Sequence, residues 1–484
     1  MHAGPVRRWL ILLVLLSGVF LANLDVFIVV VAMPEIRRSL GAGEAQQQLV
    51  LAGYQLVYGL GLIAGGRLGD SAGTLRTFRT GMTLFTLASA ACALAPSAGL
   101  LVAARLLQGA GTALLVPQVY RSAQTLFTGT ARRRALALTG GVMGLGAVCG
   151  QLFGGWLLTA DPAGLGWRAV FLVNVPVGAA ALAVLPWITR RGHNSRAPHA
   201  PSRVRLDLPG TGLAALALGL LTGPLLVGGP DGPGPWALPL LAASVPAALW
   251  FLRYERAAEA LGDDPLLPPR LLRCPGFGRG LAVVALVNCG LNAFVLVLGL
   301  LLQQGLGWPP LETGAGMLPA AGAFALASLA TPRLRRVPQA RALSGAAALA
   351  AAGYLGCAAS VLTYGTGALL LALGVAGAGL GLLVGPVLAA TLHHVPEDIS
   401  GAASGVVATV QQIGAALGVC ALGALFFALR HAGTGFPAAF AVTTAVIAVT
   451  TAAGGLLARG LRPAPSPAPA TGSPAGPPTG RAEP

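Results

Sequence analysis

A single carboxylate lies inside a stretch of sequence that is otherwise suited to hydrocarbon. Residues 21–34 read LANLDVFIVVVAMP, and Asp25 interrupts the apolar run. Of the 15 acidic residues, Asp25 alone falls well inside a predicted membrane span. A charge at mid-span costs about 2.5–3.5 kcal/mol on insertion scales, so such residues face a bundle interior or water. Asp25 is therefore either a structural polar contact or, as we expect, a site that gains and loses a proton.

Arg105 is the expected partner of this carboxylate. Asp25 precedes Pro34 by nine residues, which places it roughly 13 Å below the outer end of its helix at 1.5 Å per residue. Arg105 lies roughly 9 Å below Gly99, where its own span enters from outside, by the same rise. A nearby guanidinium favours the charged carboxylate, whereas separation or substrate entry favours proton uptake. The pair is predicted to act as a proton switch.

Membrane helices must position this pair. The chain is 55% hydrophobic and only 10% charged, and its mean hydropathy is +0.75, whereas about a quarter of the residues of a soluble domain are charged. Apolar stretches of spanning length recur along the chain. We expect an all-α polytopic membrane protein with 14 transmembrane helices. The expected spans are approximately residues 9–33, 47–66, 79–96, 99–119, 136–158, 168–188, 208–228, 236–252, 280–303, 311–331, 342–363, 367–390, 403–429 and 437–458.

The basic residues predict topology. All 31 are Arg, and most lie in short clusters in alternate connections, which places both termini in the cytoplasm. The net charge of +16 is thereby explained without a nucleic-acid partner. The expected organisation is an N-terminal six-helix bundle at 1–190, inserted helices seven and eight with their loops at 191–278, a C-terminal six-helix bundle at 279–460 and a disordered cytoplasmic tail at 461–484.

Small residues at helical spacing predict close packing of helices. Gly146, Gly150 and Gly154 lie on one face of the fifth span. A similar set recurs in the thirteenth span: Gly401, Gly405, Gly414 and Gly418. If the fifth and thirteenth spans are equivalent, the chain contains the internal repeat that is typical of secondary transporters.

Asp70 follows Gly69 at the inner end of the second span. A carboxylate there can cap a neighbouring helix, or pair with a cytoplasmic arginine such as Arg76 or one of residues 132–134. A contact of this kind, present in only one conformation, would bias alternating access. The alternative is an ordinary exposed acid in a loop.

A pocket for drug-like compounds is mostly apolar, with a few polar groups that orient the ligand. Polar residues are rare in these spans, which argues that they face inward, although they also hold helices together by hydrogen bonds. Tyr54, Gln55 and Tyr58 form the best group. The substrate-binding candidates are Asn23, Tyr54, Gln55, Tyr58, Gln108, Asn174, Asn292, Gln411 and Gln412.

Several segments together resemble the fourteen-span drug:proton antiporters of the major facilitator superfamily. The matching segments are LDVFIVVVAMP (24–34), GRLGDSAGTLRTF (66–78), LVAARLLQGAGTA (101–113), GAVCGQLFGG (146–155), WRAVFLVNVPVG (167–178) and SGVVATVQQIGAALG (404–418). The resemblance implies proton-coupled export of drug-like or antibiotic small molecules by alternating access. It also implies conformational gating at Gly66, Asp70, Arg76, Gly146, Gly150, Gly154 and Gly155.

The alternatives are a dedicated exporter or importer of one metabolite on the same fold and, far less favoured, a membrane-embedded enzyme. The sequence contains no HExxH, serine elbow or phosphate-binding GK[ST] loop, and the six Cys show no metal spacing. We therefore expect no cofactor and no metal, with the proton motive force as the energy source. The expected partners are the lipid bilayer, a small-molecule substrate and protons, in a bacterial cell membrane.

Overall fold

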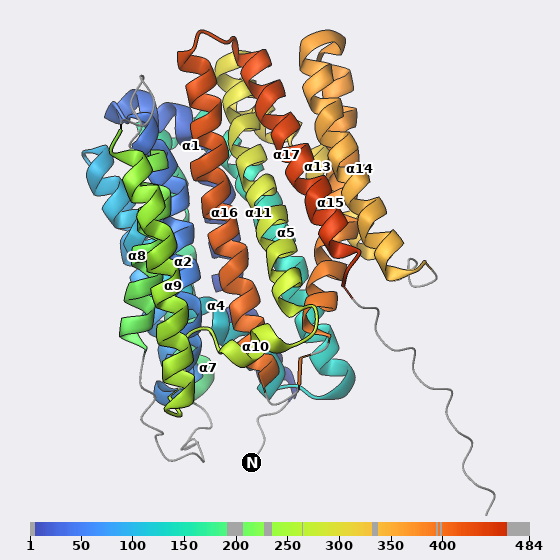
Figure 1. Ribbon diagram of the computed structural model, residues 1–484. Coiled ribbons are helices and arrows are strands. Elements are labelled where there is room, and N and C mark those ends of the chain that lie inside the picture. The colour runs from blue at the N-terminus through green and yellow to red at the C-terminus, as the bar shows by residue number, and fades with distance from the viewer. Residues whose placement is uncertain are drawn as a thin grey trace, which may run out of the picture.

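Long helices make up nearly all of the described chain, because a backbone in hydrocarbon must satisfy its own hydrogen bonds. The computed structural model describes residues 5–190, 207–226, 235–263, 265–331, 337–393, 395–396 and 399–461. The predicted disordered tail lies almost entirely outside the described residues. Figure 1 shows the helices running side by side along one direction.

The first half of the chain forms seven α-helices. They are α1 (Pro5–Leu40), α2 (Glu44–Ala72), α3 (Thr74–Ala93), α4 (Ala98–Thr125), α5 (Gly129–Ala160), α6 (Ala169–Leu172) and α7 (Asn174–Arg190). Gly73 alone separates α2 from α3, and its φ of 93° is a value that a residue with a Cβ rarely adopts. The short helix α6 leads directly into α7 and forms one span with it.

The rest of the chain continues the same pattern. Its α-helices are α8 (Leu208–Leu226), α9 (Ala237–Ala260), α10 (Pro269–Arg273), α11 (Phe277–Leu300), α12 (Pro310–Gly316), α13 (Leu318–Ala330), α14 (Gln339–Ala359), α15 (Gly365–Leu392), α16 (Ser400–His431) and α17 (Phe436–Ala458). Single π-helical turns extend α11 at Leu301–Gly305 and α14 at Ser360–Tyr364.

Twelve helices of the described chain are long and apolar enough to cross a membrane, so the protein is an all-helical polytopic membrane protein. Fourteen spans were expected, whereas the described residues contain twelve helices that qualify as spans. The described apolar part of α8 is short, covering residues 209–225. The helix α3 is not among the twelve, and it carries Arg76, Arg79 and several threonines.

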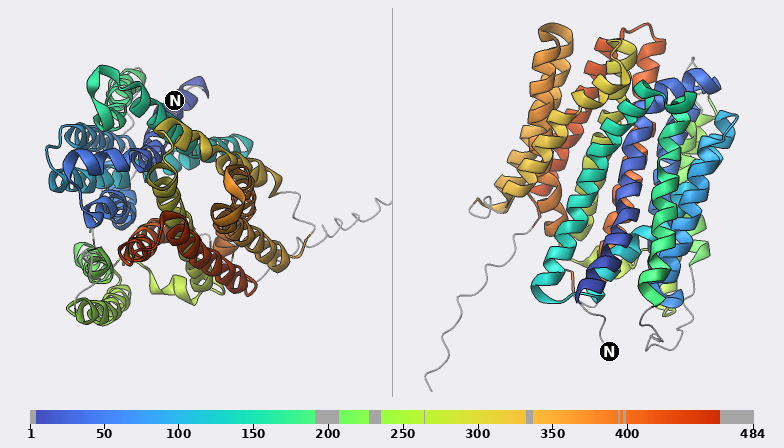
Figure 2. Two further views of the ribbon diagram at one scale, coloured as in Figure 1. Left: turned by 90° about the horizontal axis from the view of Figure 1, so that it is seen from above. Right: turned by 180° about the vertical axis from the view of Figure 1, so that it is seen from behind.

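The helices gather in two groups. Seen from above, α1 to α7 lie on one side and α11 to α17 on the other, with α8 and α9 outside, next to α2 (Figure 2). The first helix begins at the lower end of the bundle in Figure 1, which we name the proximal end, and α17 runs downward toward it. We name the opposite end, where α1 finishes at Leu40, the distal end.

Glycines let helices of each group approach closely. Gly146, Gly150 and Gly154 of α5 lie against the backbone of α1, and Gly414 and Gly418 of α16 lie against the backbone of α11 in the same way. The close packing predicted for these glycines is therefore present in both groups.

The two groups meet along two seams. Along α2 and α16, His431 Nε2 lies 3.3 Å from Glu44 Oε1 at the distal end, and farther along Thr409 Oγ1 donates to Gly59 O at 3.0 Å. The second seam joins α5 to α12 at the distal end, where Gly155 lies against Pro310. Nearer the proximal end, Cβ atoms added to the α5 glycines of residues 140, 141 and 144 would meet nothing within 4 Å. The α5 seam is thus closed distally.

Candidate functional site

Asp25 and Arg105 form an ion pair in the interior of the first group. The carboxylate comes from the middle of α1 and the guanidinium from the first half of α4. Arg105 Nη1 donates to Asp25 Oδ2, and the two side chains are 1% and 0% exposed. The predicted common depth of these residues is therefore correct, and they are direct partners.

Two amides complete the environment of the carboxylate. Gln108 Nε2, one helical turn after Arg105, donates to Asp25 Oδ1 at 2.7 Å. Asn174 Nδ2, at the start of α7, donates to the same oxygen at 2.9 Å. Three donors, one of them charged, therefore hold the carboxylate of Asp25 in place.

Ser89 of α3 joins this network, and the sequence reasoning did not identify it. Its Oγ lies 2.8 Å from Gln108 Nε2 and 3.4 Å from Asn174 Nδ2, and its side chain is fully buried. A serine is too common in membrane helices to stand out in one sequence. We name Asp25, Ser89, Arg105, Gln108 and Asn174 the Asp25 cluster.

The guanidinium of Arg105 is held on its other sides as well. Its Nε donates to Val50 O of α2 at 2.9 Å, and its Cζ lies 4.2 Å from the centroid of the Tyr54 ring. The Tyr54 hydroxyl is in turn 2.9 Å from Thr112 Oγ1. Each partner fixes the position of the charge, so the pair does not depend on a single contact.

The chemistry available to the Asp25 cluster is proton exchange. One oxygen-bound proton would neutralise the carboxylate and leave Arg105 as an uncompensated charge, which forces a rearrangement. Across the described ranges, no group of three or more His, Cys, Asp or Glu side chains could hold a metal ion. Residues of α1, α3, α4 and α7 therefore form one buried polar cluster around the carboxylate of Asp25.

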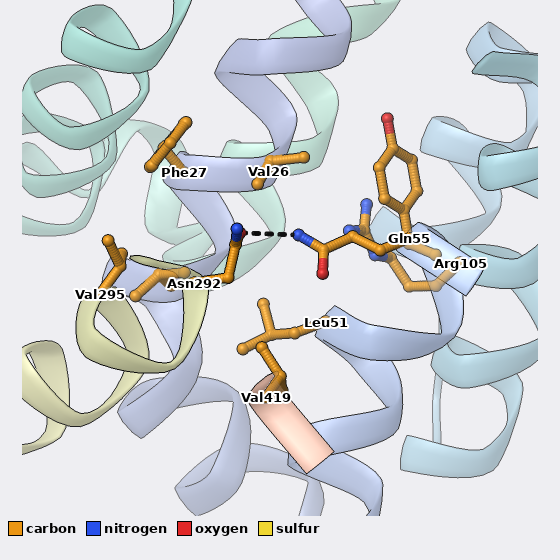
Figure 3. Close-up of a pocket in the computed structure, with 10 residues that line it drawn as sticks. Val26, Phe27, Leu51, Gln55, Arg105, Asn292, Val295 and Val419 are labelled. Carbon is orange, nitrogen blue, oxygen red and sulfur yellow. Dashed lines mark hydrogen bonds between the residues drawn. The ribbon is translucent and has the colours of Figure 1, made fainter. Parts of the chain in front are cut away.

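A small pocket lies beside the cluster, where the two helix groups face each other. Figure 3 shows Val26, Leu51 and Val419 among its apolar walls. Gln55 Nε2 of α2 donates to Asn292 Oδ1 of α11 at 3.0 Å, and this hydrogen bond crosses from one group to the other (Figure 3).

The predicted substrate residues divide between these two places. Tyr54, Gln55 and Asn292 line the pocket. By contrast, Gln108 and Asn174 donate to Asp25, so in this conformation they serve the Asp25 cluster.

The remaining candidates lie elsewhere. Asn23 donates to Val19 O of its own helix at 2.9 Å. Tyr58 packs against the Tyr54 ring with centroids 6.1 Å apart. Gln411 and Gln412 are half-buried on α16 and are not part of the pocket lining.

The predicted gating residues at the proximal end have a different partner from those expected. Asp70 forms an ion pair with Arg121, near the end of α4, rather than with Arg76. The Asp70 side chain is 55% exposed. Arg76 is exposed on α3, and a Cβ added at Gly66 would lie 4.0 Å from Pro117. The proximal contact therefore links α2 to α4, which no sequence spacing indicated.

Comparison with known proteins identifies the group to which this architecture belongs. Residues 15–419 match the family model described as Major Facilitator Superfamily. The chain is 35% identical over 442 residues to a probable actinorhodin transporter of Streptomyces coelicolor, covering 88% of this chain and 74% of that protein. It is 36% identical over 417 residues to a cephamycin export protein of Amycolatopsis lactamdurans, covering 83% and 82%.

Among solved structures, the fold is similar to that of a bacterial homolog of the human lysosomal transporter Spinster, crystallised in an inward-facing and unoccupied conformation. The TM-score is 0.64 at 19% identity, over 95% of this chain and 98% of that chain. At this identity the likeness concerns the fold alone.

Proposed function

Since this chain belongs to the Major Facilitator Superfamily, we propose that it exports antibiotic or drug-like small molecules across the bacterial cell membrane in exchange for protons. It is a transporter and not an enzyme, in keeping with the transport and export proteins to which it is similar. The observation that carries the proton-coupling part is the Asp25 cluster, a fully buried carboxylate with three donors next to a pocket.

In the proposed cycle, Asp25 is charged while Arg105, Gln108 and Asn174 hold it. A proton that reaches Asp25 removes the negative charge, so Arg105 loses its counter-ion and must find other acceptors. Because Arg105 also lines the pocket, this change reaches the bound molecule. One charge moving across 100 mV supplies about 2.3 kcal/mol, and a pH difference adds about 1.4 kcal/mol per unit.

The finer architecture is part of the proposal. Helices α3 and α8 are taken to cross the bilayer beside the twelve clear spans, because α3 packs along α4 and α8 packs along α9. This gives the 14 spans of the drug:proton antiporter family, organised as two six-helix bundles and an inserted pair. The clusters of Arg then place the proximal end, and both termini, in the cytoplasm.

A dedicated exporter of one antibiotic is the second candidate. It is favoured because the actinorhodin and cephamycin relatives are each named for a single compound. A sensitive host strain that expresses the protein and is exposed to a panel of antibiotics separates the two: protection against one compound indicates dedicated export, and protection against many indicates broad export.

The decisive test of proton coupling uses Asp25→Asn, which keeps the shape of the side chain and removes the titratable group. In inside-out vesicles, we expect the wild-type protein to accumulate a protective antibiotic when a pH gradient is imposed, and Asp25→Asn to lose that response. Glu312→Gln is the matched control, because Glu312 is an exposed acid in the first turn of α12. Undiminished pH-driven accumulation by Asp25→Asn would end the proposal.

A further inference from the structure

The polar atoms that line the pocket can be accounted for one by one. The Tyr54 hydroxyl is engaged by Thr112, and the charge of Arg105 is balanced by Asp25. The remaining polar side chains in the lining are the amides of Gln55 and Asn292. The described pocket wall therefore offers a ligand no unbalanced charge, and its specificity depends on the two amides.

The orientation of both amides is fixed by a backbone carbonyl. Asn292 Nδ2 donates to Asn288 O, one turn earlier in α11, at 3.1 Å. A flipped Asn292 would place its oxygen against that carbonyl, so Nδ2 must remain there. Asn292 Oδ1 consequently faces Gln55, and Gln55 must present its NH₂ group to it. The carboxamide oxygen of Gln55 is left on the other side.

That oxygen is a buried acceptor without a donor. Gln55 is 4% exposed, and its Oε1 has no hydrogen-bond partner among the described residues. Figure 3 shows it directed toward the side of the pocket that Leu51 and Val419 line. A buried acceptor without a donor is unfavourable, so a ligand that donates to it gains affinity.

We propose that Gln55 selects neutral, mainly apolar molecules that carry a hydroxyl or N–H donor, and that the donor binds Gln55 Oε1. The inference rests on the proposed export function and adds the chemical class of the substrate. The apolar side chains around the pocket accept the body of such a molecule. A permanently charged group finds no free counter-ion there while Asp25 and Arg105 are paired.

The test compares two probes that differ in one donor, 2-(hydroxymethyl)anthraquinone and its methyl ether. Their binding to the purified full-length protein in nanodiscs is measured by equilibrium dialysis, with empty nanodiscs subtracted. We expect the wild-type protein to bind the alcohol about tenfold more tightly than the ether. In Gln55→Leu combined with Asn292→Leu the two probes should bind equally; the second change is needed because Gln55→Leu alone frees Asn292 Oδ1 as an acceptor. Gln124→Leu, at an exposed glutamine of α4, should keep the tenfold preference.

Each outcome bears on the inference. Equal binding of alcohol and ether to the wild-type protein would overturn it without any variant, so a poorly folded double variant does not affect the test. A preference that persists in Gln55→Leu combined with Asn292→Leu would show that a group other than these two amides accepts the donor, which also overturns it. If cells are protected against antibiotics while the probes bind equally, the substrate class fails and export stands. If the wild-type protein neither protects cells against antibiotics nor binds either probe, the proposed function itself is wrong.

Discussion

The two halves of the molecule place opposite chemistry in corresponding helices. In the first half, the helices α1, α3 and α7 contribute Asp25, Ser89 and Asn174, which meet in one hydrogen-bonded network. In the second half, the first, third and sixth spans are α11, α14 and α17, and they meet through aromatic rings. One half has a polar centre and the other an apolar one.

The aromatic centre of the second half is formed by Phe294, Tyr354 and Phe440. The ring of Phe294 lies 4.7 Å from that of Tyr354 and 6.0 Å from that of Phe440, centroid to centroid. The Tyr354 hydroxyl is buried and has no hydrogen-bond partner in the part of the chain that the structure describes. This centre contributes packing, since an unpartnered hydroxyl adds no favourable interaction.

Packing between helices, in contrast, is the same in both halves. A Cβ added at Gly150 would lie 2.5 Å from Leu24 O of α1, and one added at Gly418 would lie 2.0 Å from Cys289 O of α11. The comparison shows that close contact between helix backbones does not require the same side chains at the centre of each half. Both halves use glycine to bring helices together, whereas the titratable group is placed in one half only.

The largest expected effect comes from breaking the ion pair. Arg105→Leu leaves Asp25 buried without its counter-ion and should lower the free energy of unfolding by about 3–5 kcal/mol. Phe294→Leu, which introduces a smaller apolar side chain into the aromatic centre, should cost less than Arg105→Leu, because it removes apolar contacts but leaves no unpaired buried charge. Thermal unfolding in detergent compares the two variants.

A double variant makes the first half resemble the second. Asp25→Leu combined with Arg105→Leu replaces both charges by apolar groups and should recover most of the stability lost in Arg105→Leu. Proton-driven transport should remain absent. If Arg105→Leu proves as stable as Phe294→Leu, the contrast between the two centres is wrong.

The next effect tests whether the packing is repeated. Gly150→Ala and Gly418→Ala each push a methyl group against a neighbouring backbone and should destabilise by roughly 1–3 kcal/mol. Gly144→Ala in α5 and Gly401→Ala in α16 are the controls, because a Cβ at either position meets nothing within 4 Å. Thermal unfolding again provides the measurement. A large loss of stability in only one of Gly150→Ala and Gly418→Ala would show that the glycine packing is not repeated in the two halves.

The smallest effect separates the two hydroxyls at corresponding positions. Ser89→Ala removes an oxygen that accepts from the amides of Gln108 and Asn174 and should cost roughly 0.6 kcal/mol, the average for a hydrogen bond between membrane helices. Tyr354→Phe removes a hydroxyl without a described partner and should leave the stability unchanged or slightly higher. Equal losses in the two variants would show that Tyr354 has a partner after all.

The common level of Asp25 and Arg105 along the helix bundle could be predicted from the sequence. Asp25 and Arg105 were paired by counting residues from the helix ends, because every helix residue advances by the same rise. The glycine contacts of α5 and α16 were also predictable, since fourfold spacing marks one face. The predicted first span, residues 9–33, lies inside the longer α1, because a helix continues beyond its apolar part.

Rotation of one helix about its axis relative to another could not be predicted. Gln108 and Asn174 were assigned to the substrate, but their helices are turned so that both amides reach Asp25. The partner of Asp70 was missed for the same reason, since Arg121 reaches it from another helix. Polar residues mark an interior, yet one sequence does not tell which interior surface each of them faces.

Tyr54 contacts both the ion pair and the pocket. Its ring lies under the guanidinium of Arg105, and the same residue belongs to the wall of the pocket. A bound molecule large enough to tilt the Tyr54 ring also changes the contact between this ring and the guanidinium of Arg105. In the proposed export cycle, the size of the cargo therefore acts on the Asp25–Arg105 pair through one side chain.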